Sequence, residues 1–205
     1  IVRLFHPDIG GGATTVARGS PSPSGPFRVL FFGRIMPYKG LAVLVKAVEK
    51  LRREGHRLDL GVAGMGSLGD MQARLSALGA EVIDRWIPNE ELEPLLQRYD
   101  AIACSHVEAS QSGVAALAFG HRIPVVGTPV GGLTEQIVDG KTGVLSPDVS
   151  ADGFAAVLKR LMTEPGLYEA ITSNLAATAS QRSMSRFSET LLADLETRIA
   201  AGGTR

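Results

Sequence analysis

The regular part of the chain begins near residue 27, where short apolar runs start to alternate with longer amphipathic stretches. The run FRVLFFG at 27–33 is almost continuously apolar, which is typical of a strand buried on both faces. The next stretch, LAVLVKAVEKLRREG at 41–55, repeats its apolar residues at helical spacing and ends at a glycine. It therefore predicts a helix with one buried face.

The same alternation of strand and helix continues about six times along the chain. Strands are predicted at 58–64, 80–84, 100–105, 123–128 and 143–146, and helices at 67–79, 89–99, 112–121, 132–140 and 151–162, with two more helical stretches after them. Because the strands are continuous apolar runs, we expect parallel strands with helices covering both faces. The predicted fold class is α/β, a doubly wound and mostly parallel Rossmann-like sheet of about six strands.

The segments on either side of this pattern suggest a larger protein. Residues 1–26 are predicted to be an inter-domain segment followed by a Gly/Ser/Pro-rich linker, 27–182 the sheet domain, and 183–205 a C-terminal helix. The last helix carries an apolar stripe, formed by Phe187, Leu191, Leu192, Leu195 and Ile199. We expect the chain to be a fragment whose last helix has lost its partner, with weak self-association as one consequence.

Composition narrows the class of protein. Apolar residues make up 44% of the chain, which excludes disorder, and 21 basic residues balance 21 acidic ones. Net charge therefore suggests no nucleic-acid partner, and a cationic site has to be argued from individual residues. The single cysteine, Cys104, rules out an internal disulfide and is interpreted as a small buried hydrophobe. With no membrane-spanning run, a cytoplasmic location is expected, including the inner face of the membrane.

The loop after the first strand carries the clearest candidate chemistry. Arg34 and Lys39 lie between Gly33 and Gly40, just ahead of the predicted helix at 41–55. Ligands of doubly wound sheets bind where strands end and helices begin. A guanidinium, an ammonium and a helix N-terminus at that place favour a dianion, above all a diphosphate.

The loop after the second strand contains a glycine pattern. Gly64, Gly66 and Gly69 match the G-x-G-x-x-G dinucleotide fingerprint, with Asp84 twenty residues after Gly64. The pattern follows the second strand rather than the first. Two interpretations stay open: a dinucleotide site, or a glycine turn that lets a nucleotide approach the backbone.

Two further loops follow later strands. Small and polar residues at 110–113 lead into the helix at 112–121, so that hydroxyl groups cap it and N–H groups face outward. Glu108 and His106 lie beside them at the strand end. For His106 we favour a satisfied surface or cleft histidine, and for Glu108 the role stays open. The loop GTPVGGLTEQI at 127–137 is by itself ordinary turn chemistry.

Taken in order, these segments resemble a known family. GRIMPYKG, AGMGSLGD, WIPNEELEPLLQRYDAIACS and SGVAALAFGHRIPVVGTPVGGLTEQIVDGKTGVL fall between Phe27 and Ser146. The chain resembles the C-terminal, nucleotide-sugar-binding half of a GT-B retaining glycosyltransferase of family 4, the glycosyl transferases group 1. The resemblance implies transfer of a sugar from UDP or GDP to a glycan or lipid-linked acceptor, without a metal or other cofactor. It also implies that the acceptor is held by an N-terminal domain absent from this chain, so the fragment alone is not expected to be competent.

The resemblance also assigns residues by position. Arg34 and Lys39 match the family's catalytic cationic pair on the donor diphosphate, and Ile87 falls near the base. The amides of Ser112, Gly113 and Val114 match the loop that faces phosphate and sugar. The implied donor-binding residues are Gly33, Gly64, Gly66, Ile87, Glu108, Ser110, Gln111, Ser112, Gly113 and Val114.

One departure from the family pattern concerns the ribose. The family usually has two glutamates eight residues apart, and these positions fall near Ser110 and Ala118 here. Glu108 is out of register with the first by two residues, and the ribose carboxylate is missing. The wording SQSGV resembles a variant branch of the family. The absence of a D-x-D motif agrees with a metal-independent fold.

Three functions therefore compete. A donor-binding glycosyltransferase domain explains all four loops. An NAD-type dehydrogenase domain needs the glycine fingerprint after the first strand and leaves Arg34 and Lys39 unexplained. A degenerate, non-catalytic binding module is favoured only by the missing ribose glutamate.

Overall fold

Six parallel strands form one sheet at the centre of the molecule. The computed structural model describes residues 19–22, 24–182 and 184–202. The strands are β1 (Phe27–Phe32), β2 (Leu58–Ala63), β3 (Glu81–Ile83), β4 (Ala101–Cys104), β5 (Val125–Gly127) and β6 (Gly143–Leu145). Their order is β3-β2-β1-β4-β5-β6, and each neighbouring pair is parallel. The predicted fold class is confirmed.

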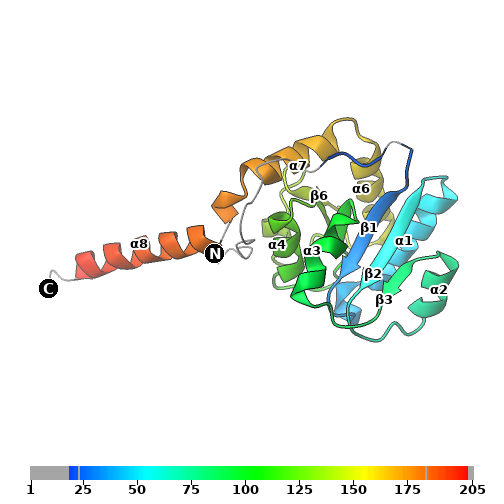
Figure 1. Cartoon of the computed structure of the whole chain (residues 1–205), viewed down its shortest axis with the longest axis horizontal. Helices are drawn as coiled ribbons and strands as arrows, with labels where there is room; N and C mark the ends of the chain where they lie inside the picture. Colours follow the sequence, from blue (N-terminus) through cyan, green and yellow to red (C-terminus); the bar gives the residue numbers. More distant parts are fainter. Residues whose placement is uncertain (1–18, 23, 183, 203–205) are drawn as a thin grey trace.

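Helices cover both faces of this sheet (Figure 1). They are α1 (Leu41–Arg53), α2 (Met71–Ala77), α3 (Asn89–Gln97), α4 (Gly113–Gly120), α5 (Leu133–Gln136), α6 (Ala151–Thr163), α7 (Leu167–Ala177) and α8 (Met184–Gly202), with single 3₁₀ turns η1 (Pro37–Lys39) and η2 (Ser180–Arg182). The chain reverses its direction across the sheet between β1 and β4, because β2 and β3 extend one way and β5 and β6 the other. With right-handed crossovers, α1 and α2 lie on one face and α3 and α4 on the other. The loops after β1 and β4 diverge at this reversal, which opens a crevice there.

The helical stripe of α1 shows why the sheet is stable. Leu44, Val45 and Val48 are fully buried against the strands, as their helical spacing predicts. Burial of each such side chain contributes about 1.5–3 kcal/mol. The last turn carries Lys50, Arg52 and Arg53, whose positive charges interact favourably with the negative end of the helix dipole.

Two predicted helices are shorter in the structure, each for a local reason. The helix expected from 67 begins at Met71, because Gly66 pairs with Ile35 and Gly69 turns with a φ of 48°. The helix expected over 132–140 is only α5, because Ile137 is extended and its side chain is buried in the core. Tertiary contacts override helix propensity at both places.

The last helix, α8, projects away from the sheet (Figure 1). Its apolar stripe is exposed: 45% of Leu191, 59% of Leu192, 45% of Leu195 and 73% of Ile199 are accessible. Most of the predicted linker at 1–26 lies outside the described residues, so the proposed domain division stays a prediction. Within the described part of the chain, none of the helices combines the length and apolar character needed to span a bilayer.

Candidate functional site

A pocket of about 700 Å³ lies at the carboxyl edge of the sheet, between the loops that follow β1 and β4. Its lining residues are Tyr38, Lys39, His106, Glu108, Ala109, Ser110, Gln111, Ser112 and Gly113. The structure thus brings the loop after the first strand together with the loop that precedes α4, as the sequence predicts.

The loop after β1 is fastened to the loop after β4 through the backbone. Gly40 has a φ of 65°, and any β-carbon there would collide with the Ser105 carbonyl oxygen. The Ser105 hydroxyl donates to the carbonyls of Gly40 at 3.0 Å and Lys39 at 3.2 Å. The Val107 N–H donates to the Tyr38 carbonyl at 2.8 Å. These contacts hold η1 against β4 and so determine where Lys39 can reach.

The loop after β5 supports the loop after β4 from the other side. A β-carbon on Gly131, whose φ is 47°, would collide with the Ala109 carbonyl oxygen. The Gly132 N–H donates to the Ser110 carbonyl at 2.8 Å. Treating this glycine pair as ordinary turn chemistry was incomplete. The spacing of the two glycines carries no signal of the contact they make with Ala109 and Ser110, each 22 positions earlier.

The amine of Lys39 lies between the end of β1 and the start of α4. A β-carbon placed on Gly33 would be 3.1 Å from the Lys39 Nζ and 3.3 Å from the Val114 Cγ2. A larger residue at Gly33 would therefore displace the amine from the N-terminus of α4.

Lys39 and Arg34 form no ion pair among the described residues, but only Lys39 lines the pocket, whereas Arg34 is exposed and is not one of its lining residues. Burial lowers the pKa of Lys39, and the charge of Arg34 lowers it further. The Cys104 thiolate would raise this pKa, but burial raises the pKa of that thiol to about 11, so it is neutral at pH 7. None of the ion pairs in the described part of the chain includes Arg34 or Lys39. Two unpaired cations close to each other favour an anionic ligand.

The first turn of α4 presents two N–H groups beside Lys39. Ser112 is the N-cap, and its Oγ accepts from the Ala115 N–H at 3.2 Å. The Ser112 N–H donates to the Gln136 Oε1 at 2.8 Å. Of the three amides matched to the family, Ser112 is thus already used, and Gly113 and Val114 have no hydrogen-bond acceptor among the described residues. Both amides lie at the N-terminus of α4, which is the positive end of the helix dipole.

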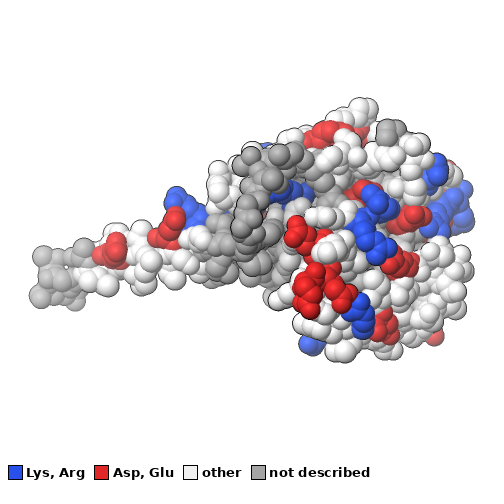
Figure 2. All heavy atoms as spheres, in the orientation of Figure 1, with Lys and Arg blue, Asp and Glu red and all other residues white. Residues whose placement is uncertain are grey.

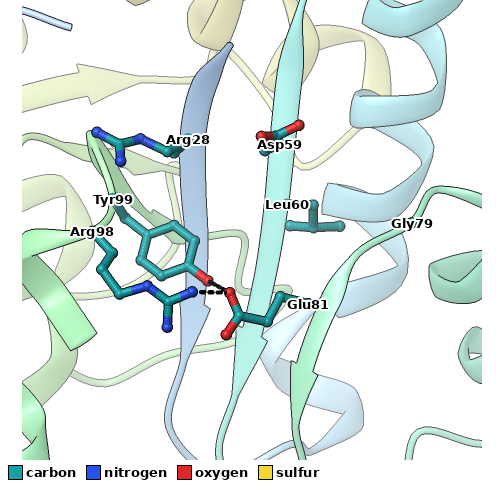
Figure 3. A pocket seen from close by; sticks show the side chains of 7 residues that line it. All are labelled: Arg28, Asp59, Leu60, Gly79, Glu81, Arg98 and Tyr99. Atoms are coloured by element: carbon teal, nitrogen blue, oxygen red, sulfur yellow. Dashed lines mark hydrogen bonds and ion pairs between the residues drawn. The ribbon is translucent and has the colours of Figure 1, made fainter. Parts of the chain in front are cut away.

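A second hollow, of about 280 Å³, lies at the opposite, amino edge of the sheet (Figure 3). There Arg98 and the Tyr99 hydroxyl both converge on Glu81. Arg28 pairs with Asp100 at 3.2 Å. Because its arginines already have carboxylate partners, this hollow offers an anion no unpaired cation, whereas Lys39 in the carboxyl-edge pocket forms no ion pair with any residue that the structure describes.

The fingerprint glycines have a structural role. A β-carbon on Gly64 would collide with the Gly33 carbonyl, and one on Gly66 with the Ile35 carbonyl. Both glycines therefore allow the loop after β2 to pack against the loop after β1. The pattern follows β2, as the sequence indicated, and α2 does not begin until Met71, so the geometry of a dinucleotide fingerprint is absent here.

The remaining sequence-predicted residues divide between pocket and core. Glu108, Ser110 and Gln111 line the pocket, whereas the Ile87 side chain is buried beside Trp86, which is 73% exposed. Ala118 is buried and supplies no polar group.

His106 is a cleft histidine, as the sequence predicts, but its hydrogen bonding is not fully satisfied. It lines the pocket and is 5% exposed, and its Nδ1 has no hydrogen-bond partner. Burial, and then the charge of Lys39, lower its pKa, which keeps the ring neutral at pH 7. Among the described residues, no cluster of three or more His, Cys, Asp or Glu side chains could hold a metal ion.

Comparison with known proteins identifies the family. The sequence profile of the glycosyl transferases group 1 matches residues 26–164. The chain belongs to this family. The C-terminal domain of a glycosyl transferase group 1 protein from Francisella tularensis has the same fold, with a TM-score of 0.64 at 20% identity, covering 77% of this chain and 86% of that domain.

Several other proteins are similar to this chain over part of their length. A D-inositol 3-phosphate glycosyltransferase from Arthrobacter sp. is 36% identical over 151 residues, which cover 70% of this chain and 36% of that protein. A glycogen synthase from Mycobacterium tuberculosis is 32% identical over 80% of this chain and 40% of its own length. Anabaena HepE, solved with UDP-glucose, has a TM-score of 0.69 at 20% identity, covering 84% of this chain and 49% of that one. The chain spans about two fifths of the length of the curated relatives it matches.

The unpaired charge of Lys39 leads to a prediction about stability. Because the folded state lowers the pKa of Lys39, the unfolded chain binds its proton more tightly, and stability rises with pH between the folded pKa and the ordinary value of 10.5. Lys39→Met should therefore raise the melting temperature at pH 7, and its advantage should shrink as the pH approaches 10.5.

Thermal unfolding followed by circular dichroism from pH 7 to 10.5 measures this. Lys46→Met is the matched control, because Lys46 is exposed on α1. A Lys39→Met protein that melts below the wild type at every pH would contradict the prediction.

Proposed function

We propose that this chain is the donor-binding domain of a retaining glycosyltransferase and binds the diphosphate of a UDP-sugar in the carboxyl-edge pocket. The observation that carries the proposal is the position of Lys39, which forms no ion pair within the described ranges, at the start of α4, where the amides of Gly113 and Val114 have no acceptor there either. Arg34 is exposed beside the pocket, near enough for its charge to lower the pKa of Lys39. An ammonium, a neighbouring guanidinium and two amides of a helix N-terminus are groups that bind the oxygens of a pyrophosphate. The UDP and UDP-glucose complexes of HepE support uridine as the base.

The chemistry assigned to this chain is electrostatic. When the bond between the sugar C1 and the diphosphate oxygen breaks, both bonding electrons leave with the oxygen, so negative charge develops there. Lys39, Arg34 and the two α4 amides stabilise that charge, and more strongly in the transition state than in the bound donor. The neutral ring of His106 adds no charge of its own to the pocket at pH 7.

The sugar and the ribose are assigned to the two sides of the diphosphate. Glu108, Ser110 and Gln111 line the pocket. The carboxylate can accept hydrogen bonds from sugar hydroxyls, and the hydroxyl and the amide can both donate and accept them. The ribose lies toward the loops after β2 and β3, with the base near Trp86 and Ile87. Because Ala118 supplies no carboxylate, other groups hold the ribose.

The acceptor, a glycan or a lipid-linked sugar, is assigned to a part of the protein outside this sequence. The share of the relatives' length that the chain covers supports this, as does the projecting, apolar α8. A non-catalytic binding module remains the second candidate, favoured by Ala118 alone. Transfer of radiolabelled glucose by the full-length protein separates the two, because a binding module takes up UDP-glucose without turnover.

Removing either cation should weaken diphosphate binding. Arg34→Ala and Lys39→Ala are each expected to reduce the affinity for UDP by about 1–3 kcal/mol, the range for charge-assisted hydrogen bonds. Isothermal titration calorimetry with UDP, GDP and ADP measures the loss and the base preference together. Arg28→Ala, at the amino edge, is the control and should bind UDP like the wild type. Unchanged UDP affinity in the Arg34→Ala/Lys39→Ala double variant would refute the assignment.

Binding should also depend on pH through Lys39. The ammonium binds the diphosphate and the neutral amine does not, so affinity for UDP should fall as the pH rises through the lowered pKa of Lys39. Lys39→Arg keeps its charge throughout this range and should bind with an affinity that stays level. Titrations from pH 7 to 10 test the difference, and a wild-type profile as level as that of Lys39→Arg would count against it.

The exposed stripe of α8 predicts weak self-association of this chain. Burial of Leu192 and Ile199 against a second copy would remove apolar surface from water. Sedimentation velocity at rising concentration should show an oligomer that Leu192→Glu/Ile199→Glu abolishes. A Thr190→Glu protein, changed on the same helix outside the stripe, should still associate. A monomer at every concentration would refute the prediction.

A further inference from the structure

The side chain of Gln136 is bonded to both backbone polar groups of Ser112. Its Oε1 accepts from the Ser112 N–H at 2.8 Å, and its Nε2 donates to the Ser112 carbonyl at 3.1 Å. The two residues are 24 positions apart: Ser112 is the N-cap of α4, and Gln136 is the last residue of α5. The amide of Gln136 therefore replaces the pairing that a neighbouring strand would provide, at the residue where α4 starts.

Gln136 is itself held in place. It is the last residue of α5, whose first residue, Leu133, is 0% exposed, and the residue after it, Ile137, is 2% exposed. A β-carbon on Gly127 would collide with the Ile137 side chain, so Ile137 packs directly against β5. The amide group thus extends from an anchored short helix rather than from a free loop.

This pairing determines which amides of α4 are free. Ser112 Oγ occupies the third N–H of the helix, at Ala115, and Gln136 occupies the N–H of Ser112. Only the N–H groups of Gly113 and Val114 are left between these two, beside the Lys39 amine. Loss of the Gln136 contact would free the Ser112 N–H and remove the side-chain link between α5 and the first turn of α4. Among the described residues, Ser112 would then be held within that turn only by its bonds from Ala115 and Ala116.

We propose that Gln136 is a positioning residue for the donor diphosphate: it fixes the backbone of Ser112 so that the Gly113 and Val114 amides and Lys39 address one anion. This rests on the proposed function of the pocket. Gln136 touches no ligand in this arrangement and acts only through Ser112. Small misplacements of donors around a charged group reduce binding strongly, because each charge-assisted hydrogen bond depends on direction.

The test separates positioning from a merely structural contribution. Gln136→Met keeps the length of the side chain and removes both hydrogen bonds. It should reduce UDP affinity by about tenfold, because a displaced Ser112 misaligns the charge-assisted hydrogen bonds that the Gly113 and Val114 amides would make to the diphosphate. Its affinity for uridine, measured by NMR titration, should not change, because uridine has no phosphate. Asn174→Ala is the matched control: it removes a side-chain amide bond to the Lys141 carbonyl, 2.8 Å long, on α7. It should bind UDP like the wild type.

A measurement on the wild-type protein tests the inference even if the Gln136→Met variant does not fold. In the free protein the Ser112 amide should exchange its hydrogen slowly, whereas those of Gly113 and Val114 exchange fast and become protected when UDP is added. A Ser112 amide that exchanges as fast as its neighbours, or a Gln136→Met protein with wild-type UDP affinity, would overturn the inference. If the wild type itself does not bind UDP, the proposed function fails with it. If only the Arg34 and Lys39 variants lose UDP, the inference alone is wrong.

Discussion

The close backbone contact between Gly40 and Ser105 is the constraint on which the site depends. Because Gly40 has no β-carbon, the chain can turn there against the Ser105 carbonyl, and the Ser105 hydroxyl closes the contact with two hydrogen bonds. The turn that carries Lys39 is thereby placed over β4 rather than in solvent. The amine then reaches the start of α4, and the pocket forms between the two loops.

The distribution of charge separates the two edges of the sheet. At the amino edge, Arg28 and Arg98 each have a carboxylate, and the buried Tyr99 hydroxyl shares one of them. At the carboxyl edge, Lys39 is partly buried, close to a second cation and in no ion pair with the described part of the chain, and Glu108 lines the same pocket without pairing with it. Figure 2 shows acidic and basic side chains interspersed over one face of the domain, as the balanced composition implies. The overall charge therefore does not indicate a function, whereas the unpaired charge of Lys39 indicates an anion-binding site.

The sequence predicted the parts of this structure that follow from local patterns. Six apolar runs and the helical stripe of α1 correctly predicted the parallel sheet, and the place of Lys39 after the first run predicted that it lies at the carboxyl edge. The roles of Arg34 and Lys39 in binding stay predictions. The start of α2 and the shortness of α5 were not predictable, because Gly66 and Ile137 respond to contacts with distant residues. The pairing of Gln136 with Ser112 was missed for the same reason. An amide in a predicted helix gives no signal of a partner 24 residues away.

The strand order has a consequence for how this domain assembles. β1 and β4 are neighbours in the sheet, although Val29 and its partner Ala101 are far apart in the chain, and the pocket is built from the loops that follow these two strands. The β1-β2-β3 unit can form from nearby segments, but the crevice cannot exist until β4 has joined it across that long loop. Competence to take up a ligand is thus a late property of the folding chain, and an intermediate that contains only the first three strands has no pocket to fill.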